Sequence, residues 1–252
     1  MRKIKFFAAI LTTISSLTFF SVTAQNTAQK VNPFKANVDF MSRYVWRGTD
    51  YGNSPSIQPS ISYTNSNITV GTWAAYTTNT QSLQEVDIYV SYAFSKLFSL
   101  TITDYFFPNQ DNSNDKYFNY NDTSTRHVIE ASANYTFSKK IPLSLLVATN
   151  IYGADARRIN YDGSMGTKQF STYAELNYTF KNIQVFLGSN LTHENKNIGE
   201  TGYYGNSIGV INLGATVTKQ IKFTEIYNLP LTISLITNPQ TQKIFLVAGF
   251  SF

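Results

Sequence analysis

Nine charged side chains are spaced so that they could act together on passing solutes. Most of them recur at every second or fourth residue, in segments whose other positions are rich in apolar and aromatic residues. Successive side chains of a β-strand point to opposite faces, so this spacing gathers the charges on one face of each strand. The set is Lys35, Asp39, Arg43, Arg47, Glu85, Asp87, Arg126, Glu130 and Glu175.

Two interpretations fit a charged face that lines an interior. The charges could form a constriction that selects solutes by sign and size, or they could be salt-bridged struts that fill a narrow lumen. Buried opposite charges normally pair, which favours struts for Asp39, Arg43, Glu85 and Asp87. Arg47 is predicted at the outer mouth, where it is the residue best placed for solute contact.

Alternating hydrophobicity predicts twelve strands that could carry these charges. Each is near the roughly 9–11 residues that a tilted membrane strand needs. In the first strand, the predicted apolar face carries Phe34, Val38, Phe40, Tyr44 and Trp46. Pro59 predicts a bulge or an irregular start in the second. The predicted ranges are 34–48, 56–64, 68–77, 85–94, 98–107, 126–137, 142–152, 168–180, 183–193, 208–218, 229–237 and 243–252.

The links between these strands alternate in length. Even-numbered links, such as residues 65–66 and 181–182, are short. The exception is the link at residues 219–228, in which residues 221–226 could form an extra strand. The odd-numbered links include three long segments rich in Asn, Asp, Gly and Tyr, at residues 108–125, 153–167 and 194–207. Membrane barrels have short periplasmic turns and longer outer loops, so the pattern predicts an up-and-down barrel with its outer loops on one side.

Both ends of the chain support export to an outer membrane. Residues 1–24 have the basic start, apolar stretch and small-residue cleavage site of a signal peptide. Residues 25–33 are then a short periplasmic segment, and residues 34–252 are the barrel. The last strand ends on Phe250 and Phe252, which resemble the C-terminal signal that the barrel-assembly machinery recognises in bacterial outer-membrane barrels.

Composition excludes several other classes of protein. The formal charge of +5 falls to +2 once Arg2, Lys3 and Lys5 leave with the signal peptide (5 − 3 = 2), so no nucleic-acid partner is indicated. No unbroken apolar run long enough for a membrane helix follows the signal. The aromatic content of 15% fits the aromatic girdles of a membrane barrel, and with no Cys the chain must gain stability from backbone pairing.

One segment carries a family resemblance. Residues 42–49 read S-R-Y-V-W-R-G-T and are followed by P-S-I-Q-P at residues 55–59. This resembles the opening of the TorF family of bacterial porin-like proteins of unknown function, in which S-x-Y-V-[FW]-R-G leads to P-x-I-Q. Glu130 and residues 173–176 also resemble family positions. Arg43 and Pro59 depart from the pattern, where an acid and a Gly are common. The resemblance implies an outer-membrane barrel with passive transport and names no substrate.

Other chemistry finds little support in the sequence. Neither His127 nor His193 has a Ser two residues away, as the twelve-stranded outer-membrane phospholipase would require, so no enzyme is predicted. Residues 111–115 resemble half a calcium loop but lack its Gly and its Glu. No metal or other cofactor is therefore predicted. Tyr51 and residues 203–205 are predicted to lie on outer loops, as loop-packing residues or as platforms for sugars.

The sequence thus predicts one all-β, twelve-stranded antiparallel barrel in the outer membrane of a Gram-negative bacterium. The predicted function is passive diffusion of small polar or charged solutes. Two alternatives remain: a non-conducting barrel whose outer loops bind a ligand, a partner or the lipid surface, and a lipid-modifying barrel enzyme. Predicted partners are outer-membrane lipid and lipopolysaccharide, the barrel-assembly machinery and small solutes. The sequence predicts no oligomeric state.

Overall fold

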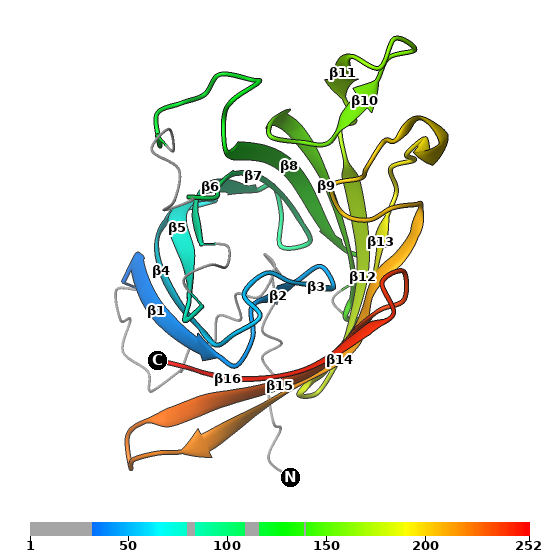
Figure 1. Cartoon of the computed structure of the whole chain (residues 1–252). Coiled ribbons are helices and arrows are strands. Elements are labelled where there is room, and N and C mark those ends of the chain that lie inside the picture. Colours follow the sequence, from blue (N-terminus) through cyan, green and yellow to red (C-terminus); the bar gives the residue numbers. More distant parts are fainter. Residues whose placement is uncertain (1–31, 80–83, 109–115, 139) are drawn as a thin grey trace.

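Twelve antiparallel strands close into a barrel in the computed structural model, which describes residues 32–79, 84–108, 116–138 and 140–252. Each strand pairs with its neighbour along the chain, and β16 closes the ring on β1 (Figure 1). The predicted fold is confirmed. The wall strands are β1 (Phe34–Met41), β4 (Ser56–Asn65), β5 (Ile68–Thr77), β6 (Glu85–Ala93), β7 (Phe98–Phe106), β8 (His127–Thr136), β9 (Leu143–Gly153), β12 (Thr172–Phe180), β13 (Ile183–Asn190), β14 (Gly209–Lys222), β15 (Asn228–Asn238) and β16 (Lys243–Ser251).

The wall turns its apolar side chains outward and its polar ones inward. In β6, Ile88 and Val90 are exposed on the outer surface, whereas Glu85, Asp87 and Tyr89 are buried within. Over the described residues, buried polar and charged side chains outnumber buried hydrophobic ones. This inverts the distribution of a soluble protein and is the one expected where lipid surrounds the wall. The described part of the chain contains no helix long and apolar enough to span a membrane.

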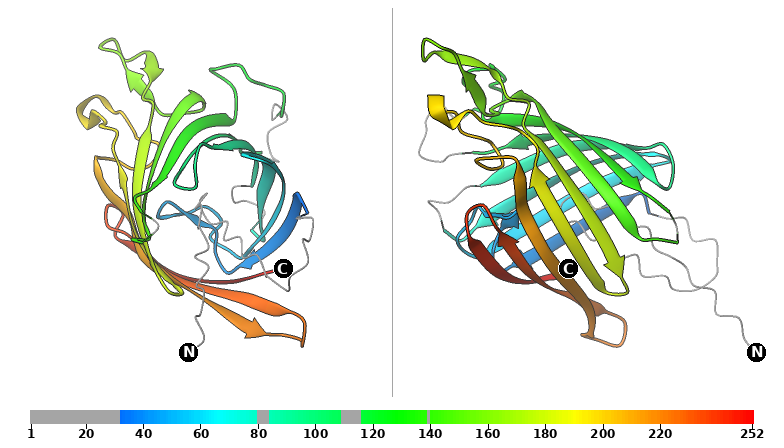
Figure 2. Two further views of the ribbon diagram at one scale, coloured as in Figure 1. Left: turned by 180° about the vertical axis from the view of Figure 1, so that it is seen from behind. Right: turned by 90° about the vertical axis from the view of Figure 1, so that its right-hand side faces the viewer.

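The links sort by length between the two ends of the barrel. At one end, β4–β5, β6–β7, β8–β9, β12–β13 and β14–β15 are joined by short turns. β14 runs on to Lys222 and β15 begins at Asn228, so the link predicted at residues 219–228 is itself a short turn, and no extra strand forms within it. The longer links lie at the other end, where the tilted strands lead into the outer loops (Figure 2); the link between β15 and β16, which also lies there, is short.

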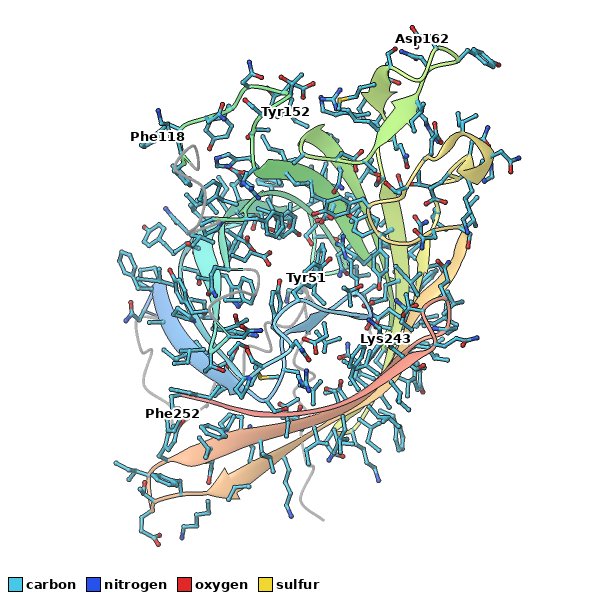
Figure 3. All side chains as sticks on the ribbon, viewed as in Figure 1. Tyr51, Phe118, Tyr152, Asp162, Lys243 and Phe252 are labelled. Atoms are coloured by element: carbon cyan, nitrogen blue, oxygen red, sulfur yellow. The ribbon has the colours of Figure 1, made fainter. Side chains whose placement is uncertain are left out.

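The first predicted strand is too long. β1 ends at Met41, and residues 42–55 turn into the barrel, where β2 (Val45–Trp46) and β3 (Thr49–Asp50) pair as a small hairpin. Arg47 and Gly48 form its two-residue turn with φ of 47° and 77°, which is the backbone of a tight hairpin turn. We call residues 42–55 the lumen hairpin; Figure 3 shows Tyr51 inside the ring of strands.

Two further predictions about the strands need correction. The strand predicted at residues 168–180 divides: Met165–Lys168 is β11, which pairs with β10 (Arg157–Ile159) in an outer-loop hairpin, and the wall strand β12 starts only at Thr172. Pro59 makes no bulge. Its neighbours in β4 keep one register with β5 on both sides of it, Ile57 opposite Tyr76 and Ser60 opposite Trp73.

Some predictions fall outside the described residues. The signal peptide at residues 1–24, most of the periplasmic segment at residues 25–33, and the calcium-like residues 111–115 are among them. One short 3-10 helix, η1 (Lys196–Ile198), lies in the outer loop between β13 and β14.

Candidate functional site: a lumen crossed by a hairpin

The lumen hairpin is seated against the barrel wall at Gly48. A Cβ atom on this residue would lie 1.9 Å from the carbonyl oxygen of Ile211 in β14, so only glycine fits. The Asn238 amide donates a hydrogen bond of 3.2 Å to the carbonyl oxygen of Gly48. The backbone of β14 and the Asn238 side chain of β15 therefore fix where the tip of the hairpin stands.

Arg47 at this tip forms a buried ion pair with Glu130 of β8. Its Nη1 lies 2.6 Å from Oε2 of Glu130 and its Nη2 lies 3.1 Å from Oε1, and the two side chains are only 5% and 2% exposed. This two-pronged geometry is the strongest form of the arginine–carboxylate contact. Glu130 also accepts hydrogen bonds from Tyr105 at 3.1 Å and Tyr204 at 2.8 Å.

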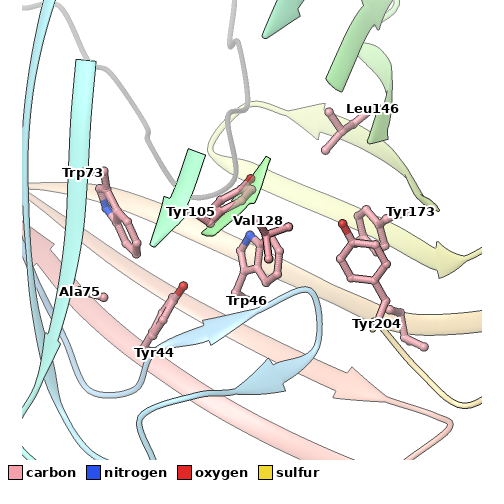
Figure 4. Packing of buried hydrophobic residues seen from close by; sticks show 10 residues of the cluster. Tyr44, Trp46, Trp73, Ala75, Tyr105, Val128, Leu146, Tyr173 and Tyr204 are labelled. Carbon is pink, nitrogen blue, oxygen red and sulfur yellow. The ribbon is translucent and has the colours of Figure 1, made fainter. Parts of the chain in front are cut away.

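Aromatic rings surround the same guanidinium. Its central carbon lies 4.3 Å from the ring centre of Trp46, 4.5 Å from that of Tyr173 and 5.0 Å from that of Tyr204. Distances below about 6 Å allow a cation–π attraction. Figure 4 shows these three residues converging with Tyr105 inside the barrel. The Tyr204 hydroxyl also accepts a hydrogen bond of 2.7 Å from Arg47 Nη1.

The predicted positions of Tyr44 and Trp46 are wrong. Both were expected on the outward apolar face with Phe40, yet they are buried at 4% and 7% exposure, while Phe40 faces outward at 37%. The reason is that the wall strand stops at Met41 while the alternation of side chains continues into the hairpin. Their rings pack inside the lumen, Tyr44 against Trp73 and Trp46 against Tyr105.

A pair of acids lies beside the hairpin on β6. The Tyr44 hydroxyl donates a hydrogen bond to Glu85, and Asp87 follows Glu85 on the same inward face. Oδ1 of Asp87 is buried and has no hydrogen-bond partner among the described atoms. On the other side of the hairpin, Glu175 accepts hydrogen bonds from Tyr173 and from Asn212, the latter at 2.8 Å.

Two polar cavities meet at Arg47. One, of about 280 Å³, is lined by Lys35, Thr101, Glu130 and neighbouring Ser and Thr residues. The other, of about 170 Å³, is lined by Asp39, Arg43, Glu175 and others. Arg47 lines both cavities. The Arg47–Glu130 pair therefore stands between these two cavities.

The structure places most of the predicted charged residues around these cavities. Arg47 is the main correction: it was predicted at the outer mouth in contact with solutes, and it is buried instead, because the hairpin carries it inward. Arg43 belongs to the hairpin rather than to a wall strand, and it pairs with Asp50 at 2.8 Å. Arg126 directly precedes β8, is half-buried and lines neither cavity.

Sequence reasoning missed part of this cluster. Tyr204 lies in an outer loop as predicted, between β13 and β14, but its side chain is 6% exposed and its hydroxyl reaches the Arg47 guanidinium, a contact that was not predicted. Asn150 of β9 was not singled out, and its Oδ1 lies 3.0 Å from the Tyr204 hydroxyl oxygen. A local signal was Gly48 at the end of the predicted strand, since a Gly in a strand pattern suggests an irregularity or a close approach of another backbone.

Ion pairs between side chains connect the outer loops to one another. Asp122 pairs with Arg157 at 2.6 Å and also with Lys168, and hydrogen bonds from Lys168 and then Arg157 lower the pKa of Asp122. Glu200 accepts hydrogen bonds from the backbone N–H groups of Asn195 and Ile159, which lower its pKa, and pairs with Arg158 at 3.0 Å.

His127 has a structural role at the outer rim. Its side chain is fully buried, with Nδ1 2.8 Å from a carboxylate oxygen of Asp104 and Nε2 facing the carbonyl oxygen of Tyr117. The ring of Tyr120 stacks on it at 4.1 Å. These contacts hold residues 116–125 against the barrel. The described residues contain no group of three or more His, Cys, Asp or Glu that could hold a metal ion.

The two C-terminal aromatic residues lie at the seam of the barrel. Phe250 stacks on Phe40 at 5.6 Å, and Phe252 meets the same ring edge-on at 5.9 Å. The backbones of Phe252 and Val38 exchange two hydrogen bonds of 3.0 Å. These residues therefore close the wall between the first and last strands.

Comparison with known proteins places the chain in a sequence family. A family model described as "Bacterial protein of unknown function (Gcw_chp)" matches residues 25–213; that description does not carry the TorF name. No curated protein matches the sequence. Among solved structures, the KdgM porin is similar with a TM-score of 0.45 and 10% identity, over 86% of this chain and 98% of that one. BamA from Haemophilus ducreyi lacking POTRA domains 1–3 is similar with a TM-score of 0.40 and 12% identity, over 81% and 41%.

Proposed function

Since the chain belongs to the Gcw_chp family of bacterial proteins of unknown function, we propose that it is an outer-membrane channel for small polar or charged solutes. The observation that carries the proposal is the pair of polar cavities that meet at Arg47 inside a barrel with an apolar exterior. In this proposal the signal peptide directs export, and the C-terminal strand is read by the barrel-assembly machinery.

The lumen hairpin sets the width of this channel. At about eight strands, side chains fill a barrel, and at 16–18 an aqueous pore opens; a twelve-stranded barrel lies between these limits. Here the hairpin occupies space that the wall alone would leave open. Solutes pass from one cavity to the other when the tip of the hairpin and the Arg47 side chain give way.

The fixed charges favour cations. Arg43 and Arg47 are matched by Asp50 and Glu130, whereas Glu175, which lines the cavity of about 170 Å³, accepts hydrogen bonds from the neutral side chains of Tyr173 and Asn212. Rings of acidic side chains make a pore selective for cations. We therefore expect a cation-selective channel.

The test is single-channel conductance of the purified, refolded barrel in planar bilayers, wild type beside Arg47→Ala. Loss of the guanidinium removes the barrier between the cavities, so larger or longer openings are expected from the variant, with a reversal potential that indicates cations in a salt gradient. Arg43→Ala is the matched control, because it removes another arginine of the same hairpin that does not touch Glu130. A folded barrel that stays silent in all three forms would overturn the proposal.

A second candidate function is a non-conducting barrel whose outer loops bind a ligand, a partner or the lipid surface. The ion pairs of Asp122 and Glu200, which fix the outer loops in one arrangement, favour it. A silent but correctly folded barrel in the conductance test would support this candidate.

A further inference from the structure

We propose that the wall site filled by Arg47 is a binding site for small solutes that carry a guanidinium group, and that such solutes exchange with the Arg47 side chain. The exchange of a solute with Arg47 during passage rests on the proposed channel function. Binding of a solute at the site is independent of that function, because it can be measured without any transport.

The wall holds most of this site without help from the hairpin. Glu130, Asn150 and Tyr173 belong to β8, β9 and β12, and Tyr105 belongs to β7. Trp46 is carried by the hairpin itself, and Tyr204 belongs to the loop between β13 and β14. The Glu130 carboxylate and the Tyr173 ring, which hold the guanidinium from the wall, therefore stay in place when the hairpin tip moves away.

The geometry selects a guanidinium group over an ammonium group. Glu130 receives two parallel contacts, at 2.6 and 3.1 Å, from the two terminal nitrogens of Arg47. A flat, forked cation makes both contacts and also stacks on aromatic rings, whereas an ammonium is a point charge. Nε of Arg47 is buried without a hydrogen-bond partner. The site thus uses only the terminal half of the group, which any alkylguanidinium presents.

Glu130 also makes the site unstable when empty. Its side chain is 2% exposed, and a buried carboxylate without a cation is costly. An incoming cation that takes the place of Arg47 leaves no unpaired charge on the wall. The cavity of about 280 Å³ that contains Glu130 and Arg47 in its lining gives such a solute room to approach.

The test uses the full barrel in detergent, with Arg47→Ala leaving the site open and ethylguanidinium as the probe. The chain has two Trp residues, and Trp46 and Trp73 both lie in the cluster around the hairpin, so tryptophan fluorescence reports binding. Ethylguanidinium is expected to bind Arg47→Ala at least about ten times more tightly than ethylammonium, because one charged hydrogen bond is lost with the latter. Arg43→Ala should bind the probe no better than the wild type does.

The double variant Arg47→Ala/Glu130→Gln tests whether the Glu130 carboxylate binds the guanidinium probe. It should bind ethylguanidinium at least about ten times more weakly than Arg47→Ala alone. Equal affinity for the two cations, or binding that survives Glu130→Gln, would overturn the proposal. If Arg47→Ala folds poorly, the yield of folded barrel with and without ethylguanidinium replaces the titration, and only a gain that ethylammonium does not give supports the site. If the barrel binds ethylguanidinium but shows no conductance, the binding site is supported and the proposed channel function is not.

Discussion

Gly48→Ala should loosen the lumen hairpin while leaving the barrel wall intact. The new Cβ would stand 1.9 Å from the carbonyl oxygen of Ile211, and real Cβ contacts are essentially never under 3.0 Å. The tip must therefore move by at least 3.0 − 1.9 = 1.1 Å. The shortest Arg47–Glu130 contact, 2.6 Å, can lengthen by only 3.5 − 2.6 = 0.9 Å before it reaches the limit of a hydrogen bond, about 3.5 Å.

The cost of this change can be estimated from two contributions. An alanine in the left-handed region costs about 1–2 kcal/mol, and Gly48 has φ of 77°. Loss of a hydrogen bond to a charged group costs about 1.5–3 kcal/mol. Together these destabilise the docked hairpin relative to the displaced one by about 2.5–5 kcal/mol. The ratio of displaced to docked hairpin therefore rises at least roughly fifty-fold.

Single-channel recording is the assay, and the expected result is a higher open probability or conductance than the wild type shows. Heat-modified electrophoretic mobility should be that of the wild type, because the wall hydrogen bonds are untouched. Gly163→Ala is the control: Gly163 has φ of 80° in an outer loop with nothing within 4 Å of an added Cβ. The reasoning fails if Gly48→Ala conducts like the wild type or like Gly163→Ala.

Three other expectations can be checked separately. Glu175→Gln should reduce cation selectivity, measured as a reversal potential closer to zero in a salt gradient, because Glu175 lines the cavity of about 170 Å³. His127→Gln should free the loop of residues 116–125 and raise its rate of cleavage by chymotrypsin about ten-fold or more, as expected for loss of a buried charged hydrogen bond; an unchanged rate would mean that His127 does not hold the loop. Because the pKa of Asp122 is lowered by its Lys and Arg partners, its contribution is complete above the ordinary aspartate value of about 3.9 and is lost as the pH falls through the lowered value. Hydrogen exchange in β10–β11 should therefore rise only below about pH 4, and a rise near neutral pH would contradict this.

The wall could be predicted from sequence because each strand carries its own signal. In β6, for example, Ile88, Val90 and Tyr92 alternate with polar residues over a length that fits a membrane strand, and the structure places them outward as expected. The short turns helped further, since they fix the register of each antiparallel pair. These features are local, so a single sequence is enough to reveal them.

The hairpin could not be predicted in this way. Tyr44 and Trp46 stand in the same period-two phase as Val38 and Phe40, with only Ser42 between them, so the period alone cannot tell a wall strand from a hairpin that turns inward. The partners of Arg47 lie 83 residues away at Glu130 and 157 residues away at Tyr204. No local pattern links residues at such separations, and the binding cluster becomes visible only when the barrel is closed.

The Arg47–Glu130 pair also bears on the mechanics of the barrel. The lumen hairpin leaves the end of β1, and its tip reaches Glu130 on β8 and the Tyr173 ring on β12. Four strands (β16, β15, β14 and β13) separate β1 from β12 in one direction around the ring, and four (β4, β5, β6 and β7) separate β1 from β8 in the other. Both strands therefore lie across the lumen from β1. The hairpin is thus a cross-brace that ties opposite walls together. The same arginine that stands between the two cavities therefore also links wall strands that have no backbone pairing with one another.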